Sequence, residues 1–297
     1  MNSDEWKMKA VLKTGKAMEI VSKKEDVRRL RWGDASLSWG LVPTMGYLHE
    51  GHLELIRRAR AENDRVGVSI FVNPAQFNKP EDLEKYPRDM DRDADLLEDA
   101  GVDLLWTPTP GIVYPAGYQT YVDVGRVTRF LEGASRPGHF RGVATVVAKL
   151  FNVFQPARAY FGQKDAQQVV VIRRMAEDLD FNLQVIVCPT VREKNGLAMS
   201  SRNVRLLPEH RRQAVRLHEA LLAAEKACRS GARDAMLLKK TMLDVISAAP
   251  AARVDYVSAA DPDTLEELDN VTGGVLLSLA VHFGAVRLID NMMLEMN

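Results

Sequence analysis

Two histidines stand three residues apart in VPTMGYLHEGHLELIRRAR, residues 42–60, between a segment with the pattern of a strand and one with the pattern of a helix. The first N–H groups of a helix lack intrahelical acceptors and carry partial positive charge, so an anion is a natural ligand there. Gly51 would let a ligand approach the backbone, while His49 and His52 could donate hydrogen bonds to phosphate oxygens. Alternatively, one histidine caps the helix and the other packs in the core. A zinc site is less favoured, because HEGH is not HExxH and no third ligand follows at a suitable spacing.

Two later loops offer cations and hydroxyl groups for a polyphosphate. In YFGQKDAQQ, residues 160–168, Gly162 is expected to end a strand, Lys164 to supply a mobile cation and Asp165 to cap the next helix. In GLAMSSRN, residues 196–203, two serine hydroxyls precede Arg202. Each loop by itself is also compatible with an ordinary polar turn. The turn that carries His49 and His52 is called the histidine turn below. Together with it, the two loops favour a nucleoside triphosphate held between a fixed and a closing domain.

Amides and carboxylates elsewhere could hold a second substrate and a metal ion. Gln76 follows the apolar stretch IFVN, and Gln168 lies on an expected helix. Two amides in one pocket can hold a hydroxylated carboxylic acid without adding charge. Asp89, Asp91 and Asp93 could reach a magnesium ion, although a solvated acidic helix start is the simpler interpretation.

The glycine-rich stretch GASRPGHFRGV carries Arg136, His139 and Arg141, and we expect it to form a mobile lid over an anionic ligand. The sequence has no GxxxxGK[ST] loop, and no GxGxxG follows an expected strand. These absences remove the main support for a P-loop or a dinucleotide-binding protein.

Composition indicates a soluble protein with no large electrostatic field. Forty Lys and Arg balance forty Asp and Glu among 297 residues, which gives no general attraction to nucleic acid or a membrane surface. No run approaches the ~18 apolar residues that a membrane span needs, and the N-terminus lacks a secretory h-region. The two cysteines, Cys188 and Cys228, cannot form a disulfide framework and suit a reducing compartment. We therefore expect a cytoplasmic protein that binds neither nucleic acid nor membrane.

Strand and helix patterns alternate up to about residue 190 and then change. Strands are expected at 38–44, 65–73, 102–109, 157–162 and 182–190, and helices at 51–63, 90–101, 142–156 and 165–179. This alternation predicts a parallel sheet covered on both faces, with ligands at the carboxyl ends of its strands. Helices at 208–231 and 232–249 and strands at 253–261, 273–283 and 285–294 then follow. They predict a smaller α+β domain at 191–297 after an α/β domain at 1–190, in which residues 1–18 form an extension.

With these stretches assembled, the chain closely resembles the pantothenate synthetase (pantoate–β-alanine ligase) family, a branch of the nucleotidyltransferases with an HIGH-type motif. The match runs from about residue 19 to the C-terminus. The motifs PTMGYLHEGH, SIFVNPAQF, YPR, LEGASRPGHFRGV, FGQKDAQQ, GLAMSSRN and RLIDN appear in the family's order. The resemblance implies a Rossmann-like nucleotidyltransferase domain and a homodimer.

The resemblance also implies a two-step reaction. Pantoate carboxylate attacks the α-phosphate of ATP to give pantoyl adenylate and pyrophosphate, and the β-alanine amine then displaces AMP to form pantothenate. The alternative is another adenylyltransferase with the HxGH turn that acts on a phosphorylated acceptor. A catalytically inactive nucleotide-binding subunit is a further alternative, which the retained histidines and lysine disfavour.

Carried over motif by motif, the resemblance implies which residues bind ATP. His52 would be the proton donor and His49 its phosphate-binding neighbour. Lys164 would contact the phosphates, Val191 the adenine region, and residues 199–202, which end in the catalytic Arg202, would form the KMSKS-type loop. The implied ATP-binding residues are Met45, Gly46, Tyr47, Leu48, His49, Glu50, Gly51, His52, Gly162, Gln163, Lys164, Asp165, Val191, Met199, Ser200, Ser201 and Arg202.

For the remaining ligands, the resemblance implies that Gln76 and Gln168 hold pantoate, with Gln76 also a candidate for contact with β-alanine. Asp93 best matches the family's aspartate on the Mg²⁺ side, although Arg92 stands beside it where some relatives are acidic. Gln163 replaces the glutamate of many relatives, and we expect this change to have little effect.

Overall fold

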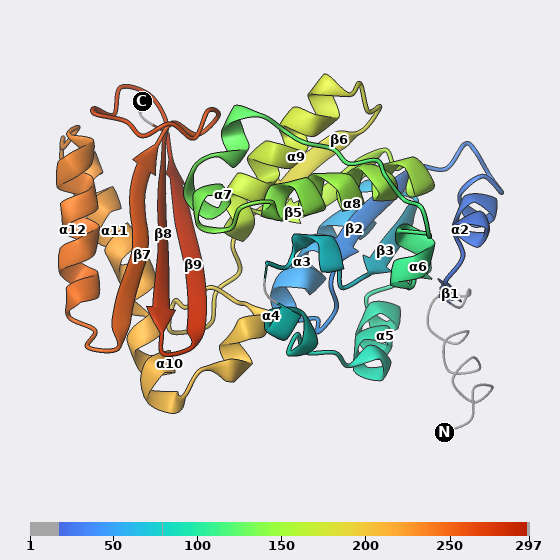
Figure 1. Cartoon of the computed structure of the whole chain (residues 1–297), viewed down its shortest axis with the longest axis horizontal. Helices are drawn as coiled ribbons and strands as arrows, with labels where there is room; N and C mark the ends of the chain where they lie inside the picture. Colours follow the sequence, from blue (N-terminus) through green and yellow to red (C-terminus); the bar gives the residue numbers. More distant parts are fainter. Residues whose placement is uncertain (1–17, 79, 296–297) are drawn as a thin grey trace. The chain divides into compact units, whose positions relative to one another are not determined.

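Six short parallel strands form the sheet of the N-terminal part of the chain (Figure 1). The computed structural model describes residues 18–78 and 80–295. The strands are β1 (Glu19–Val21), β2 (Trp39–Thr44), β3 (Arg65–Ile70), β4 (Leu104–Trp106), β5 (Arg158–Gly162) and β6 (Gln184–Cys188). Their order across the sheet is β1-β4-β3-β2-β5-β6, and every neighbouring pair is parallel. The predicted parallel α/β sheet is confirmed.

Helices connect these strands. The longer ones are α2 (Lys24–Arg31), α3 (Glu50–Glu62), α5 (Met90–Asp99), α8 (His139–Phe154) and α9 (Ala166–Asp178), and the short ones are α4 (Pro80–Glu84), α6 (Pro110–Val113) and α7 (Leu131–Ser135). Helix α8 is apolar on nearly all sides and almost entirely buried, as expected for a helix within a core. A Cβ at Gly67 of β3 would lie 2.6 Å from the Phe154 ring, so glycine permits this close packing of helix on strand.

The order of the sheet reverses between β2 and β5. From β2 the chain proceeds to β3 and β4 on one side, and from β5 to β6 on the other. β2 pairs with β3 over six residue pairs but with β5 over only two, at Gly40 and Leu41 near its start. The carboxyl ends of β2 and β5 are therefore unpaired with each other, at the place where open α/β sheets bind their ligands.

A three-stranded antiparallel sheet with three helices forms the C-terminal part. The helices are α10 (Pro208–Ala214), α11 (Arg216–Arg229) and α12 (Ala235–Ser247), and the strands are β7 (Ala252–Ala260), β8 (Val275–Phe283) and β9 (Val286–Leu294), with β8 in the centre. Alternate residues of β8, from Val275 to Phe283, are buried in one cluster with Leu221 of α11 and Leu238 of α12. The residues between them, Leu276, Ser278 and Ala280, are buried as well, so β8 is buried on both faces as the central strand of its sheet.

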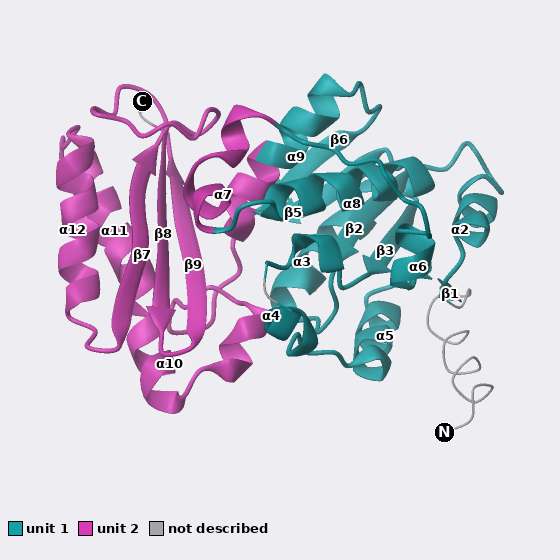
Figure 2. Ribbon diagram, in the orientation of Figure 1, with its two compact units in different colours: residues 1–124, 136–162, 171–188 teal, residues 125–135, 163–170, 189–297 magenta. Residues whose placement is uncertain are grey.

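The contacts divide the chain into two units, which Figure 2 shows in different colours. Unit 1 comprises residues 1–124, 136–162 and 171–188, and unit 2 comprises residues 125–135, 163–170 and 189–297. The short segment 125–135 belongs to unit 2, and the side chain of Glu132 within it bonds to residues of that unit. Glu132 accepts hydrogen bonds from Arg287 at 2.7 and 2.8 Å and from the Tyr256 hydroxyl at 3.0 Å. The predicted domain boundary at residue 190/191 stays a prediction.

Three local differences from the sequence analysis stand out. The helix predicted at 208–231 is two helices that meet at Val215, whose backbone stays helical with φ −59° and ψ −28°. His139 and Arg141 lie in the first turn of α8 and not in a loop, because the helix begins directly after Gly138, a residue with φ 82°. Strand β1 and helix α2 were not predicted, and the predicted extension at 1–18 lies outside the described residues except for Met18.

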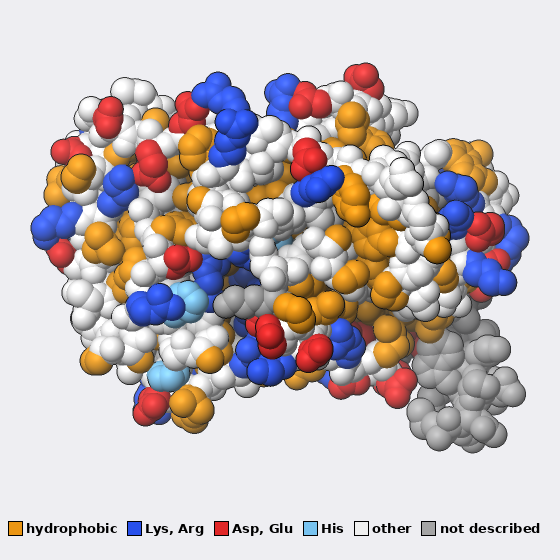
Figure 3. All heavy atoms as spheres, in the orientation of Figure 1, with side chains coloured by type: hydrophobic (Ala, Val, Ile, Leu, Met, Phe, Trp, Pro, Cys, Tyr) orange, Lys and Arg blue, Asp and Glu red, His pale blue; other side chains and the backbone are white. Residues whose placement is uncertain are grey.

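No helix within residues 18–78 and 80–295 has the length and apolar character needed to cross a bilayer. On the face drawn in Figure 3, basic and acidic side chains are interspersed. This agrees with the balanced composition.

Candidate active site

The histidine turn connects β2 to α3 through backbone that favours glycine. Gly46 has φ 80° and Tyr47, which follows it, has φ 53°. A left-handed conformation is strained for tyrosine, so it persists only where neighbouring groups hold it. The group that holds it here is Asp93 of α5. Its two carboxylate oxygens accept the N–H of Tyr47 at 2.6 Å and the N–H of Leu48 at 2.7 Å.

Asp93 is almost completely buried, with 1% of its surface exposed. Burial raises the pKa of its carboxyl above the usual value, while the hydrogen bonds from Leu48 and Tyr47 act in the opposite direction. Arg92 lies 3.6 Å from the same carboxylate and donates to the Leu48 carbonyl at 2.9 Å. Successive backbone N–H groups around one anion form a nest, so Asp93 is built into the turn as its fixed anion.

His49 and His52 cap α3 reciprocally. His49 Nδ1 accepts the Gly51 N–H at 3.1 Å, and His52 Nδ1 accepts the His49 N–H at 3.3 Å. The two rings lie 4.1 Å apart, measured between centroids. Because each Nδ1 is an acceptor, the proton of each neutral ring resides on Nε2. Both rings therefore cap the helix, where the sequence alternative had one capping histidine and one packed in the core. Their phosphate-binding role stays a prediction.

Gln76 lies in a short 3₁₀ turn, Pro74–Gln76, directly after β3. Its side-chain Oε1 accepts from Asn73 Nδ2 at 2.9 Å, and its Nε2 donates to the Met45 sulfur at 3.2 Å. Helix α8 approaches this turn closely, since a Cβ at Gly142 would lie 2.2 Å from the Ala75 carbonyl oxygen. Only glycine fits at this crossing.

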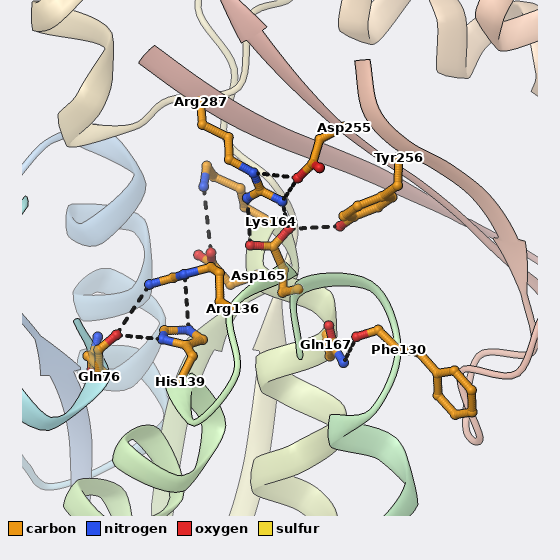
Figure 4. Close-up of polar contacts among 11 residues, drawn as sticks. Gln76, Phe130, Arg136, His139, Lys164, Asp165, Gln167, Asp255, Tyr256 and Arg287 are labelled. Carbon is orange, nitrogen blue, oxygen red and sulfur yellow. Dashed lines mark hydrogen bonds and ion pairs between the residues drawn. The ribbon is translucent and has the colours of Figure 1, made fainter. Parts of the chain in front are cut away.

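The main-chain carbonyl of Gln76 is held by two residues from the predicted lid (Figure 4). His139 contacts it through Nδ1 at 2.8 Å and Arg136 donates to it at 3.3 Å, while the two side chains lie 3.2 Å apart. A carbonyl can only accept, so His139 donates from Nδ1 and its Nε2 accepts from the Arg136 guanidinium. These two residues form part of the fixed frame around Gln76.

In unit 2, Asn291 of β9 holds the loop that carries Lys164. Its Nδ2 donates to the carbonyls of Gln163 at 3.0 Å and Lys164 at 2.8 Å, and its Oδ1 accepts from Gln163 Nε2 at 3.1 Å. The Lys164 side chain is 17% exposed, and its ammonium lies 3.7 Å from Asp165. Gln163 thus exchanges two hydrogen bonds with Asn291, one through its side chain and one through its main-chain carbonyl. Its place beside Lys164 in the sequence did not indicate this contact.

The predicted KMSKS-type loop is also fixed within unit 2. Ser200 accepts the Arg202 N–H at 3.2 Å at the start of the turn Ser201–Arg205. The Met199 N–H donates to the Val191 carbonyl at 2.9 Å, so these two predicted ATP-site residues are neighbours. Arg192 beside them forms a two-fold ion pair with buried Asp290, at 2.6 and 3.0 Å.

The predicted site residues fall into two groups. Unit 1 brings together residues 45–52, Gln76 and Asp93 through the contacts above, and it also contains Gly162 at the end of β5. Unit 2 contains residues 163–165, Gln168 on α9, Val191 and residues 199–202. Three residues of these contacts were not predicted as site residues: Asn73 and Tyr114 in unit 1, and Asn291 in unit 2. Asn73 could have been noticed from its place between an apolar strand and a proline, three residues before Gln76.

The placement of Asp93 on the Mg²⁺ side of the site stays a prediction. Among the described residues, no group of three or more histidine, cysteine or acidic side chains could hold a metal ion. Both oxygens of Asp93 already accept backbone N–H groups.

Comparison with known proteins gives one consistent result. The family described as pantoate-beta-alanine ligase matches residues 19–293. The pantothenate synthetase of Roseiflexus castenholzii is 60% identical over 256 residues, which cover 86% of this chain and 92% of the relative. That of Moorella thermoacetica is 57% identical over 261 residues, or 88% of this chain and 92% of the relative.

Solved structures give the same result. The crystal structure of pantothenate synthetase from Thermus thermophilus is similar with a TM-score of 0.87 and 48% identity, covering 93% of this chain and 99% of that one. The pantoate-beta-alanine ligase from Francisella tularensis, described as complexed with "Beta-gamma ATP" and β-alanine, has a TM-score of 0.78 and 36% identity, with 93% and 98% covered.

Proposed function

The chain belongs to the pantoate–β-alanine ligase family, and we propose that it condenses pantoate with β-alanine through a pantoyl adenylate formed at the histidine turn. The observation that carries this proposal is the reciprocal capping of α3 by His49 and His52. This arrangement fixes two Nε2–H donors at a helix N-terminus, the kind of place where proteins bind phosphate. The turn also follows β2 at the point where the order of the sheet reverses.

In the proposed first step, a pantoate carboxylate oxygen attacks the α-phosphorus of ATP, and the bond from that phosphorus to the β,γ-pyrophosphate breaks. In the second step, the β-alanine amine attacks the acyl carbon, AMP leaves with the carboxylate oxygen, and the amine loses a proton. The first step brings the pantoate carboxylate to the anionic phosphates of ATP and expels pyrophosphate. The second step expels AMP, which is also an anion. Catalysis therefore consists mainly of positioning and charge stabilisation, and it needs no covalent bond to the enzyme.

The residues proposed to bind ATP are those of the sequence analysis. His52 donates a proton to the departing phosphate oxygens, and His49 binds beside it. Lys164 and Arg202 would offset charge on the phosphates. Support comes from the local order of their loops, since Asn291 fixes the backbone at Lys164 and Ser200 caps the turn at Arg202.

Gln76 and Gln168 are proposed to bind pantoate. The side chain of Gln76 contacts only uncharged groups among the described residues, namely Asn73 and Met45. Amide groups suit a hydroxylated acid, whereas an acceptor that carries a phosphate would need cations at the point of contact. This distinction disfavours the rival adenylyltransferase.

Mg²⁺ is proposed to enter with the phosphates of ATP and not through Asp93. Mg²⁺ in nucleotide enzymes keeps several waters and binds mainly through substrate phosphates. Asp93 instead holds the histidine turn, so no step is assigned to an Asp93-bound metal.

Exchange of labelled pyrophosphate into ATP tests the proposed function. We expect exchange that depends on pantoate and proceeds without β-alanine, because adenylate formation is reversible and precedes amine attack. Exchange that requires a phosphorylated acceptor, or ATP binding with no exchange under any condition, would contradict the proposal.

Two further proposals concern the state of the protein in the cell. A homodimer is proposed from the family resemblance, and light scattering would test it. A cytoplasmic location is proposed because Cys188 and Cys228 are both buried thiols that form no disulfide within the described residues, as suits a reducing compartment. Fractionation of cells would test the location.

A further inference from the structure

The amide of Asn73 has only one orientation that satisfies its neighbours. Its Nδ2 lies 3.1 Å from the Gly142 carbonyl oxygen, which can only accept, so this atom must be the donor. Its Oδ1 lies 3.3 Å from the Ala75 N–H, which can only donate. Asn73 is 1% exposed, so water cannot substitute for either partner without cost.

Tyr114 continues this chain of hydrogen bonds on one side. Its hydroxyl lies 2.8 Å from Asn73 Oδ1, and it must donate because that oxygen is an acceptor. Burial raises the pKa of the Tyr114 phenol above its usual value, so the hydroxyl keeps its proton throughout the working pH range.

Gln76 continues the chain on the other side. Asn73 Nδ2 donates to Gln76 Oε1 at 2.9 Å, which leaves the Nε2 end of Gln76 directed at the Met45 sulfur, 3.2 Å away. A thioether is a weak acceptor, so these N–H groups would form a stronger hydrogen bond to an oxygen acceptor. The Gln76 main chain is held as well, because His139 and Arg136 both contact its carbonyl.

We propose that Tyr114 and Asn73 are positioning residues that fix the direction of the Gln76 amide, so that Gln76 donates hydrogen bonds to the acid substrate and does not accept them. The hydrogen bonds run one way, from the Tyr114 hydroxyl to Asn73 and from Asn73 to Gln76. A site that only donates selects the acceptor oxygens of an ionised carboxylate and leaves an analogue with an N–H at that position unmatched. The inference rests on the proposed role of Gln76 in binding pantoate.

Pantoate-dependent pyrophosphate exchange would test this direction in four variants. In Tyr114→Phe the ring stays and one neutral hydrogen bond is lost, so we expect the KM for pantoate to rise about 2- to 10-fold. In Asn73→Asp an acceptor replaces the Nδ2 donor, so Gln76 must turn its oxygen outward; we expect a rise of roughly 10- to 100-fold. The KM for ATP should change less than twofold in both variants, a split that general loss of structure would not produce.

Tyr118→Phe is the matched control. Its ring packs against that of Tyr114 with 5.1 Å between centroids, and the described residues give its hydroxyl no hydrogen bond. We expect this variant to behave as the parent enzyme. Tyr114→Phe preserves packing, so the test remains decisive even if Asn73→Asp does not fold.

Gln76→Ala separates the pantoate-binding role of Gln76 from the orienting role of Tyr114 and Asn73. If this variant leaves the KM for pantoate unchanged, the proposed pantoate-binding role of Gln76 is wrong. If it raises that KM strongly, while Tyr114→Phe and a folded Asn73→Asp match Tyr118→Phe, only the orienting role is overturned.

Discussion

Asp93→Asn is the sharpest structural prediction, because one carboxylate accepts two backbone N–H groups of the histidine turn at 2.6 and 2.7 Å. Asparagine offers one oxygen, so its NH₂ group must oppose either the Tyr47 or the Leu48 N–H. A buried donor left unsatisfied costs about 1–3 kcal/mol, and we expect the free energy of unfolding to fall by about that amount. Asp93→Ala leaves both N–H groups unsatisfied and should cost roughly 2–6 kcal/mol.

Activity should fall as well, because Tyr47 and Leu48 directly precede His49. A displacement of about 1 Å at a catalytic group can lower the rate by as much as ~10²-fold. Urea unfolding would measure the stability, and pantoate-dependent pyrophosphate exchange would measure the activity. Asp89→Asn is the matched control: Asp89 caps the same helix by accepting the Arg92 N–H at 3.3 Å, and asparagine caps as well as aspartate.

A titration with magnesium distinguishes this positioning role from metal binding. If Asp93 acts through the turn, excess Mg²⁺ should not restore the activity of Asp93→Asn. Recovery at high Mg²⁺, or an Asp93→Asn enzyme as stable and active as Asp89→Asn, would refute the reasoning.

The remaining predictions concern catalysis, titration and thiol reactivity. His52→Ala and Lys164→Ala should each lower kcat by roughly 10²–10³-fold, as loss of one transition-state donor typically does; undiminished kcat at saturating ATP would exclude that role. Burial lowers the pKa of His218, so its contribution to stability is full above its unfolded pKa of about 6.5 and is lost as pH falls toward its lower folded value. His218→Gln should therefore lose less stability than the parent chain between pH 7 and pH 5.5 in thermal melts, and equal losses would contradict this. Cys188 is 1% exposed and burial raises the pKa of its thiol, so Ellman's reagent at pH 8 should modify it only after unfolding; rapid reaction in the native protein would show the opposite.

Much of the fold was accessible from sequence because its elements are long enough to show periodicity. The stretches at 38–44 and 51–63 contain a buried strand and a helix, and the structure places β2 and α3 there. β1 has only three residues at the edge of the sheet, too few for a pattern to emerge. The break between α10 and α11 at Val215 contains no glycine or proline, so the local sequence does not predict it.

The site shows where sequence reasoning stops. Spacing placed His49 and His52 at a helix start, and the structure confirms that position. It could not show which aspartate of the run 89–93 faces inward, since that depends on contacts with a turn more than 40 residues earlier. It also could not show that Arg136 and His139 hold the Gln76 carbonyl. Such roles follow from tertiary contacts, which one sequence does not display.

Transfer of oxygen from pantoate to AMP is the most direct measurement of the proposed mechanism. Pantoate labelled with ¹⁸O in both carboxylate oxygens would be converted with ATP and β-alanine, and the products analysed by mass spectrometry. We expect one ¹⁸O in the phosphate of AMP and one in the amide carbonyl of pantothenate, because the attacking oxygen leaves with phosphorus. AMP without label, or label in inorganic phosphate, would contradict attack on the α-phosphorus.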